Sequence, residues 1–369
     1  MKSRFYILAL ILSMSILACA QDKNPTNIHH SHEMVVPDLK NPWGFVFLPD
    51  NAMLITEKSG ALIHFKNGKK TRITGLPEIH VYGQGGLMDI ALHPDYKSNG
   101  WIYFSYASSD GNGQGGHTAI ARAKLSNNAL VNFQVLYKAT PNTKAGQHFG
   151  SRIVIDNNNF LFFSIGDRGN RDVNPQDLTK DGGKIYRLHD DGSIPTTNPF
   201  VTTPNAKKAI YSYGHRNPQG MAIHPKTKSI WIHEHGPKGG DEINIVQAGN
   251  NYGWPKVTYG VNYSGTEITN KTTLPGMTEP IHYWDPSIAP SGMAFITSSI
   301  YPDWKGNLVV GSLKFQYLDL CYLEGKKVIK EERLLDGLGR VRSVVQGPDG
   351  YIYVGIENLG IVKILPKKA

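Results

Sequence analysis

The sequence predicts an all-β fold, a six-bladed β-propeller of four-stranded antiparallel blades. One hairpin pattern recurs six times: an apolar strand, a turn at Pro-Asp, Asp-Asn or Pro-Lys, and a second strand rich in β-branched and aromatic residues. Each copy is followed by a further strand candidate, and the 39 glycines and 22 prolines indicate many turns. Repeats of this length and strand content are typical of propellers, because a sandwich would not repeat one hairpin six times.

The six hairpins follow one another in chain order, with irregular spacing. They span residues 43–55, 86–106, 151–165, 220–233, 292–311 and 341–355. The further strand candidates span residues 61–65, 119–125, 184–188, 242–246, 318–323 and 360–365. Three long connections remain, over residues 168–183, 190–209 and 259–289. Loops of this length usually shape a site, so we expect them on one face, around the mouth of the central channel.

The N-terminus has the features of an export signal. Lys2 and Arg4 precede an apolar run over residues 5–18, which is too short to span a bilayer as a mature helix. The run ends in Ile-Leu-Ala-Cys, so Cys19 is the expected lipidation site of a bacterial lipoprotein. A soluble periplasmic protein cleaved nearby is the alternative. We therefore divide the chain into a lipoprotein signal peptide (1–18), a flexible tether (19–35) and a single propeller (36–369), with a periplasmic or outer-membrane-anchored location.

Charge and cysteine content narrow the range of partners. The formal net charge is +9, but the cations are spread along the chain without the stripe or module that nucleic acid requires. We therefore expect a small acidic ligand, no nucleic acid, and no membrane contact beyond a lipid anchor. Cys321 is the one cysteine besides Cys19, so no intramolecular disulfide is expected, and Cys321 is interpreted as a buried thiol. We expect a monomer.

The stretch from residue 213 to residue 254 carries the strongest chemical signal. Arg216 and Asn217 lie on a turn closed by proline and glycine, and this pairing suits carboxylate or quinone oxygens. Gly236 and Pro237 then break a strand and free backbone carbonyls, which are ligands for hard cations. Considered singly, Arg216 could equally form a structural salt bridge, and the acidic residues that follow could form a solvated turn.

Further candidate residues open the second and third repeats. Gln84 lies in a glycine-rich turn before the second hairpin, and His148 precedes the third. Such segments lead into the innermost strands, so His148 is a candidate general base, since imidazole titrates near neutrality. A hydrogen-bonded core histidine is the alternative. Asp167 lies one hairpin later, where it could orient the imidazole.

Taken together, the motifs resemble those of a known family. Gly-His-Arg-Asn-Pro-Gln-Gly (214–220), Gly-Pro (236–237), Asp-Glu-Ile-Asn (241–244) and Asn-Tyr-Gly-Trp-Pro (251–255) are similar to the soluble PQQ-dependent sugar dehydrogenases of the glucose/sorbosone dehydrogenase family. The similarity extends from residue 43 to near the C-terminus. Gln147 and His235 depart from the glucose-oxidising branch and fit the aldose branch better, so the preferred sugar stays open.

The resemblance implies a role for each candidate residue. The implied catalytic residues are His148, Gln84, Asp167 and Arg216. The implied PQQ-binding residues are Gln84, His148, Arg216, Asn217, Lys314, Arg340 and Arg342. Gly236 and Pro237 resemble the carbonyl ligands of the calcium that contacts PQQ, while Glu242 and Tyr252 resemble ligands of a second, structural calcium.

These residues suggest oxidation of an aldose at C1 to the lactone. His148 would take the proton of the anomeric hydroxyl while hydride passes to the quinone, calcium would polarise the quinone carbonyl, and an external acceptor would then take the electrons. A calcium-dependent propeller lactonase or a non-catalytic binding propeller is the alternative. A lactonase would need carboxylates converging on one metal, whereas the axial positions here are largely cationic.

The pair Arg340 and Arg342 offers an argument independent of the family. Residues i and i+2 of a strand share a face, so two like charges are placed side by side. The nearby acids Asp336 and Asp349 lie on turns and are poorly placed to neutralise both. We therefore expect a bound polyanion to relieve the repulsion between the two arginines. We also expect the protein without its ligand to tolerate the loss of Arg342.

Overall fold

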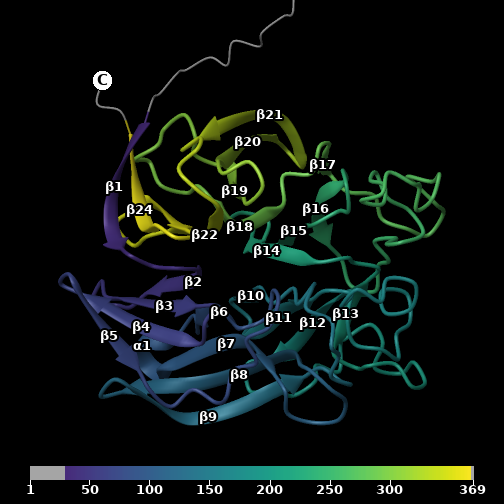
Figure 1. Cartoon of the computed structure of the whole chain (residues 1–369), viewed down its shortest axis with the longest axis horizontal. Coiled ribbons are helices and arrows are strands. Elements are labelled where there is room, and N and C mark those ends of the chain that lie inside the picture. The colour runs from purple at the N-terminus through teal and green to yellow at the C-terminus, as the bar shows by residue number, and fades with distance from the viewer. Residues whose placement is uncertain (1–29, 367–369) are drawn as a thin grey trace, which may run out of the picture.

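The computed structural model describes residues 30–366 as six four-stranded antiparallel sheets arranged around a central axis (Figure 1). The predicted six-bladed propeller is confirmed. The proposed signal peptide, Cys19 and the first part of the proposed tether lie outside the described residues. Within the described part of the chain, no helix is long and apolar enough to cross a membrane.

The blades are formed in chain order from the axis outwards. The first three blades consist of β2 (Pro42–Phe47), β3 (Met53–Glu57), β4 (Ala61–Lys66) and β5 (Lys69–Ile73); β6 (Leu87–Leu92), β7 (Trp101–Ser108), β8 (His117–Ser126) and β9 (Ala129–Lys138); and β10 (Ile153–Ile155), β11 (Phe160–Ile165), β12 (Lys184–His189) and β13 (Ile210–Tyr213). A single helical turn, α1 (Tyr96–Asn99), joins β6 to β7.

The last three blades follow the same order. They consist of β14 (Pro218–Ile223), β15 (Ile230–Glu234), β16 (Asp241–Val246) and β17 (His282–Trp284); β18 (Pro290–Phe295), β19 (Leu308–Ser312), β20 (Leu318–Glu324) and β21 (Lys327–Leu334); and β22 (Val341–Gln346), β23 (Ile352–Ile356), β24 (Gly360–Pro366) and β1 (His30–Pro37). Each predicted hairpin forms the two inner strands of a blade, and each further strand candidate forms the third.

The N-terminal strand closes the ring. β1 pairs antiparallel with β24, so the first described segment is the outermost strand of the last blade. This corrects the predicted boundary of the tether, because residues 30–35 belong to β1. The physical reason is that β24 would otherwise present an unpaired edge. Val36 near the end of β1 is fully buried, which anchors the closure by apolar packing.

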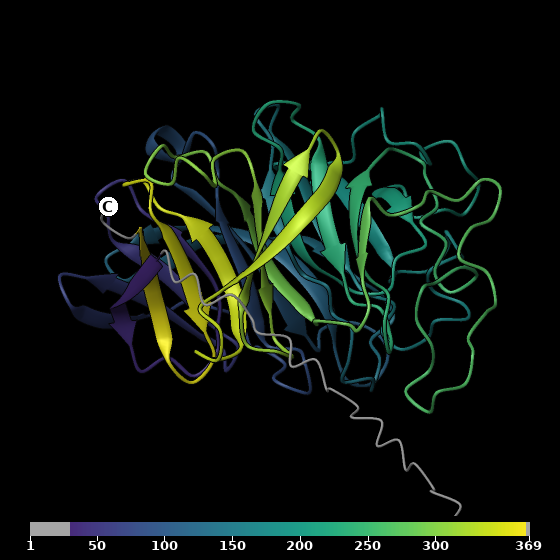
Figure 2. The same cartoon turned by 90° about the horizontal axis from the view of Figure 1, so that it is seen from above.

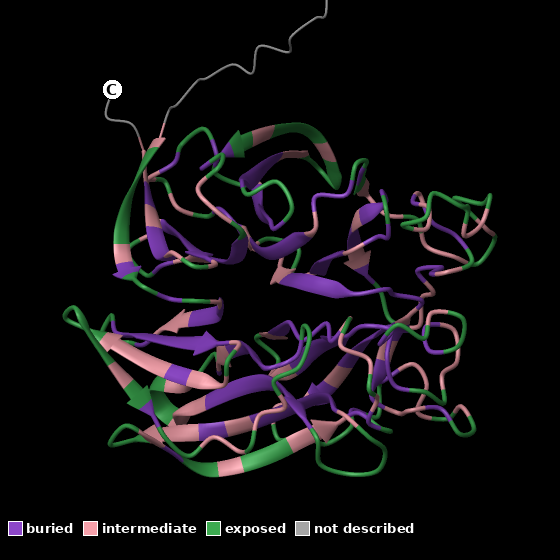
Figure 3. Ribbon diagram, in the orientation of Figure 1, coloured by how far each residue is buried: buried purple, intermediate pink, exposed green. Residues whose placement is uncertain are grey.

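The core lies between neighbouring blades. Figure 3 shows buried residues concentrated on the inner and middle strands and exposed residues on outer strands such as β5, β9 and β21. Figure 2 shows the ring from above, with the yellow strands of the last blade lying side by side. One cluster packs side chains of β19 and β20 against those of β22, β23 and β24. Cys321 on β20 is a free, buried thiol, as the sequence predicted.

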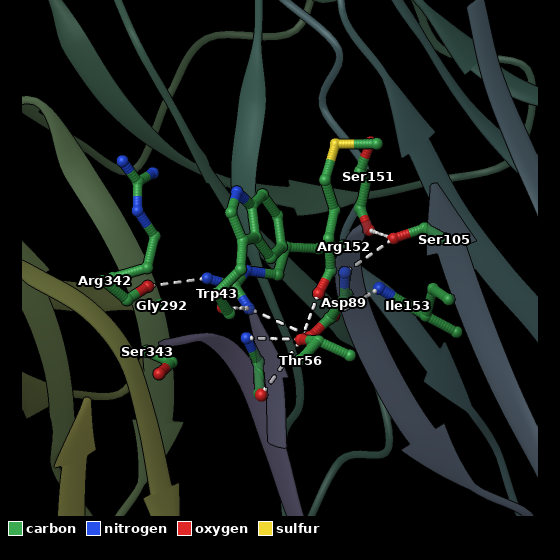
Figure 4. Close-up of polar contacts among 12 residues, drawn as sticks. Trp43, Thr56, Asp89, Ser105, Ser151, Arg152, Ile153, Gly292, Arg342 and Ser343 are labelled. Atoms are coloured by element: carbon green, nitrogen blue, oxygen red, sulfur yellow. Dashed lines mark hydrogen bonds and ion pairs between the residues drawn. The ribbon is translucent and has the colours of Figure 1, made fainter. Parts of the chain in front are cut away.

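Arg152 occupies the axis and connects five blades (Figure 4). Its guanidinium donates to the carboxylate of Asp89 at 3.0 Å and to the backbone carbonyls of Trp43 at 3.2 Å, Gln219 at 2.7 Å and Arg342 at 2.7 Å. Asp89 in turn accepts from the backbone N–H of Ile153 at 2.9 Å. This network holds the inner strands at a fixed separation where they approach one another.

The antiparallel hairpins bring two groups of residues to one edge of the ring. The start of each inner strand lies beside the end of the next strand outward, as in the pairs Pro218–Glu234, Pro290–Ser312 and Val341–Ile356. Residues just before an inner strand and residues just after the second strand are therefore neighbours. We call this edge the site edge.

The long connections differ from the expectation that all three rim one face. Residues 168–183 and the segment after residue 250 do meet at the site edge, where Gln176 donates to the carbonyl of Trp254 at 2.8 Å. The connection 190–209 instead leaves β12 at the opposite edge, so that part of the expectation is wrong. The reason is strand parity: the third strand of a blade starts at the site edge, as the pairing of Lys184 with Ile165 shows, and carries the chain away from it.

Candidate active site

His148 and Asp167 form a buried pair at the site edge. His148 precedes β10 and Asp167 follows β11, so the hairpin of the third blade brings them together. Nδ1 of His148 lies 2.6 Å from Oδ1 of Asp167. Asp167 also accepts from the indole N–H of Trp254 at 2.9 Å and from the backbone N–H of Gly169 at 2.8 Å. The carboxylate is thus held by three donors, and Nε2 of His148 is left for a substrate.

The protonation states suit a base at neutral pH. Burial lowers the pKa of His148, an effect that the bond to Asp167 opposes and the charge of Arg216 reinforces. Burial acts to raise the pKa of Asp167, but the bond to His148 and the charge of Arg216 outweigh it and hold that pKa below its ordinary value. The imidazole is therefore neutral and the carboxylate ionised, which fixes the proton on Nδ1.

The backbone of His148 is held in an unusual conformation. Its φ is +57°, in the left-handed region that non-glycine residues seldom adopt. The side chain of Gln84 accepts the backbone N–H of His148 at 2.8 Å, and the backbone N–H of Gln84 donates to the carbonyl of Gly146 at 2.6 Å. Gln84 therefore fixes the segment that carries the base, a contact consistent with its predicted place in the site.

Arg216 and Asn217 lie beside this pair, as predicted. Arg216 donates to the carbonyl of His235 at 3.0 Å, and its own carbonyl accepts the backbone N–H of Asp167 at 2.8 Å. Asn217 is fully buried and accepts from the backbone N–H of Gly150 at 3.0 Å. Its amide nitrogen has no partner among the described residues. An unpaired buried donor of this kind is costly unless a ligand accepts from it.

The arginines of the last blade contradict one part of the sequence reasoning. Glu357 follows β23 and bridges both: Arg340 Nε lies 2.7 Å from Oε2, and Arg342 Nη2 lies 2.6 Å from Oε1. The pair is thus neutralised in part without any ligand, and the argument that no acid serves it is wrong. Arg342 is buried and also donates to the side chain of Gln219 at 3.0 Å, whereas Arg340 remains open to solvent.

Lys314 is the most loosely held of the predicted cations. It follows β19, lies exposed at the site edge, and its ammonium lies 4.8 Å from the ring centroid of Phe315. The neighbouring carbonyl of Leu313 accepts from Arg340 at 3.0 Å, which places Lys314 near the arginine pair. An exposed cation beside the arginine pair suits an acidic ligand that enters from solvent.

A small cavity lies between the predicted calcium ligands. Its volume is about 10 Å³, room for about one water-sized occupant, and its lining includes Gly236, Glu242, Tyr252, Arg216 and Glu234. Burial and the nearby charge of Glu234 raise the pKa of Glu242 to about 8. A cavity lined by two acidic side chains that repel each other when both are ionised fits a cation better than it fits water.

Some side chains at the cavity are free to bind calcium, whereas other candidate ligands already have hydrogen-bond partners. Between Glu234 and Glu242 lies Asn244, whose side-chain oxygen is buried without a partner among the described residues. The hydroxyl of Tyr252 already donates to the carbonyl of Ile245 at 2.6 Å, so Tyr252 could offer only its backbone carbonyl. The carbonyl of Pro237 accepts from Ser287 at 3.3 Å. In the part of the chain that is described, no three His, Cys, Asp or Glu residues are grouped to hold a metal.

Several residues of the site were missed by the sequence reasoning. They are Lys58, Arg168, Glu234, Trp254 and Glu357. Lys58 and Glu357 directly follow the second strands of their blades, as Asp167 follows β11. That regularity was available in the repeat pattern and would have found them. Lys58 donates to the carbonyl of Gly83 at 2.5 Å and so supports the turn that carries Gln84.

The fold and the site define a class: a six-bladed propeller with a carboxylate-oriented imidazole, a cluster of cations and a small cavity lined in part by acidic side chains at one mouth of its channel. The sequence model of the glucose/sorbosone dehydrogenase family matches residues 39–362, and the chain belongs to this family. The chain is 40% identical over 361 residues to aldose sugar dehydrogenase YliI of Escherichia coli, covering 96% of this chain and 95% of that protein.

Solved structures show the same relationship. The soluble aldose sugar dehydrogenase of Escherichia coli in its apo form superposes with a TM-score of 0.86 at 39% identity, covering 91% of this chain and 99% of that one. The PQQ-bound form of the aldose sugar dehydrogenase of Streptomyces coelicolor superposes with a TM-score of 0.73 at 26% identity, covering 91% and 98%. As a member of this family, the chain is an oxidoreductase that acts on the CH–OH groups of sugars.

Proposed function

We propose that this chain oxidises aldose sugars at C1 to the lactone, using PQQ and calcium, with His148 as the general base. The observation that carries the proposal is the His148–Asp167 pair, 2.6 Å apart, facing the mouth of the channel beside Arg216. The family relationship and the PQQ-bound relative support the cofactor.

His148 performs the proton transfer. Because Nδ1 carries the proton shared with Asp167, the lone pair of Nε2 is free to accept the proton of the anomeric hydroxyl. Asp167 stabilises the imidazolium that forms, and Trp254 and Gly169 keep Asp167 in place. The lowered pKa of His148 keeps the base unprotonated at neutral pH. A deprotonated hydroxyl then releases hydride from C1 far more readily.

The residues around the base suit PQQ, whose chemistry is that of a tricarboxylate ortho-quinone. When bound, PQQ would supply the quinone that accepts the hydride, and calcium a Lewis acid beside it. Arg216, Lys314, Arg340 and Arg342 would pair with the carboxylates, and the unpaired amide nitrogen of Asn217 would donate to an oxygen of the cofactor. Gly236 and Pro237 would offer carbonyls to the metal.

The alternatives from the sequence find less support. A propeller lactonase would need several carboxylates converging on the axis, yet the axis is occupied by Arg152 paired with Asp89. A purely binding propeller would not need a buried His–Asp pair at the channel mouth.

Reconstitution tests the proposal. The purified protein is freed of metal by chelation and mixed with an aldose and an electron-accepting dye, with PQQ, calcium, both or neither added. We expect dye reduction only when both are present, and lactone as the product. Equal dye reduction with neither added, or none with any aldose when both are present, would overturn the proposal.

We further propose that the protein is an exported lipoprotein anchored to the membrane by a lipid on Cys19. It acts as a monomer and passes electrons to an external acceptor. The support is the signal-like sequence of residues 1–18 and the Cys that follows it.

A further inference from the structure

Arg168 is a buried arginine without an acidic partner. Its side chain is 2% exposed, and its guanidinium lies 3.5 Å from the ring centroid of Phe149. It donates to the backbone carbonyls of Gln147, Ala145 and Gly116, and to the hydroxyl of Thr143 at 3.2 Å. All of these acceptors are neutral. Among the described residues no carboxylate forms an ion pair with Arg168, and its Nε has no partner.

Burying this charge without an ion pair lowers the stability of the fold, so a functional role is the expected reason for keeping it. Burying a charge against neutral acceptors loses hydration that the carbonyls replace only in part, and the charge of Asp167, which is itself bonded to His148, acts on Arg168 without forming an ion pair with it. Burial lowers the pKa of Arg168 to about 9, which still leaves it charged at neutral pH. The backbone of Arg168 is itself in the left-handed region, with φ +55°. Strain of this kind gathers where the surroundings over-determine a functional conformation.

The contacts of Arg168 converge on the segment that carries the base. Gln147 directly precedes His148 and Phe149 directly follows it, so Arg168 holds the chain on both sides of the imidazole. Asp167, the residue before Arg168, holds the imidazole ring itself. Two consecutive residues therefore fix both the ring and the backbone of His148, whose φ of +57° needs such support.

We propose that Arg168 is a positioning residue for His148: its guanidinium clamps residues 143–149 from behind and holds the base in its strained backbone conformation at the channel mouth. The inference rests on the proposed function, because it concerns the group assigned as the base. Arg168 hydrogen-bonds to none of the cofactor-binding side chains, so its effect on the reaction passes through His148. The planar fork reaches several carbonyls at once while stacking on Phe149, which a lysine could not do.

The test compares the variants Arg168→Met and Arg168→Lys in the reconstituted enzyme. Arg168→Met keeps the length of the side chain without its donors, and we expect kcat to fall by roughly 10–100-fold, the range for a small misplacement of a reacting group. The KM for sugar and the affinity for PQQ, measured separately by fluorescence titration, should change by less than about threefold. Arg168→Lys keeps the charge and should lose part of the rate. It also keeps the test open if the methionine variant does not fold.

Arg187 offers a matched control. Its guanidinium also lies over an aromatic ring, 4.7 Å from the centroid of Phe160, and it bonds to side chains of the 190–209 connection. Arg187→Met should leave kcat unchanged. A fall in kcat as large as that of Arg168→Met would show that removing any ring-stacked arginine impairs the enzyme.

The double variant with His148→Gln separates the inference from the function on which it rests. If Arg168 acts through His148, Arg168→Met should have little further effect once His148 is replaced. Independent, multiplicative losses would overturn the positioning role while leaving the base intact. A His148→Gln variant with wild-type turnover would instead overturn the proposed function, whatever Arg168 does.

The pH profile supplies a second readout. The charged groups that face the imidazole are Asp167, Arg216 and Arg168, and the charge of Arg168 contributes to lowering the pKa of His148. The acid limb of kcat/KM should therefore move to higher pH in Arg168→Met and stay in place in Arg168→Lys. An acid limb of kcat/KM at the same pH in the wild type and in Arg168→Met would contradict the electrostatic effect of Arg168 on His148.

Discussion

Replacing Arg342 by alanine should destabilise the protein even in the absence of cofactor. Arg342 is buried, with a side chain 10% exposed, and gives Glu357 two hydrogen bonds, from Nε at 2.9 Å and from Nη2 at 2.6 Å. It also donates to Gln219 and to Ser291 at the axis. Removing it leaves Glu357 with Arg340 and the side-chain amide of Asn41 as its partners, and breaking a buried pair costs about 3–5 kcal/mol.

A matched variant on the same carboxylate sharpens the expectation. The side chain of Arg340 is 44% exposed, so its contact with Glu357 is worth at most about 1 kcal/mol. An unfolding entropy of about 2.1 cal/mol/K per residue gives about 0.7 kcal/mol/K for a chain of this size. Arg342→Ala should thus lower the apo melting temperature by about 4–7 °C, and Arg340→Ala by about 1 °C or less.

Calorimetry of the metal-free and cofactor-free variants measures the difference. If the apo melting temperature of Arg342→Ala equals that of the wild type, the reasoning is refuted. The expectation that a bound anion neutralises the arginine pair would then stand. Equal losses in both variants would also refute it, because burial would then not distinguish the two contacts. With PQQ and calcium added, each variant should bind the cofactor about 1.5–3 kcal/mol more weakly, the loss expected for a charged hydrogen bond.

Three further expectations follow from the site. Since burial holds the pKa of His148 below its ordinary value of 6.5, the acid limb of kcat/KM should lie below pH 6.5, so an acid limb above pH 7 would contradict the assignment. The pKa of Glu242 is raised to about 8, so the folded apo protein keeps a proton that the unfolded chain releases near pH 4.5, and apo stability should fall as pH rises between these values. Glu242→Gln should remove both this dependence and part of the stabilisation by calcium, and an unchanged stabilisation by calcium would count against the cavity as a cation site. Cys19→Ser should move the protein from the membrane to the soluble fraction, and wild-type protein already soluble after export would refute the lipid anchor.

The inner part of each blade could be predicted from the sequence and the outer part could not. The inner hairpins are buried on both faces, so they read as apolar, β-branched runs around clear turn residues, as in β22 and β23. The fourth strands are short or partly exposed: β17 has three residues, and β21 is mostly charged. β1 could not be identified because its pairing with β24 joins the two ends of the chain.

The same limit applies to the site. Residues at the starts of inner strands were found because their neighbours form recognisable motifs, as for Gln84 and Arg216. Glu357 does not stand out from its position in the sequence, because it lies 15 residues from Arg342. The pairing of β22 with β23 brings its carboxylate to the arginine. Trp254 reaches Asp167 across 87 positions of the chain, because the connection between β16 and β17 of the fourth blade lies against the third blade.

Single-turnover reduction of the bound cofactor by an aldose tests the central claim most directly. Wild-type protein and His148→Gln are loaded with PQQ and calcium without an electron acceptor, mixed rapidly with sugar, and followed by the absorbance of the cofactor. We expect the wild type to reduce its cofactor, and His148→Gln to bind PQQ with similar affinity but react roughly 10²–10⁴-fold more slowly, the factor typical of a general base. Reduction at the wild-type rate in His148→Gln, or none by any aldose in the wild type, would contradict the account.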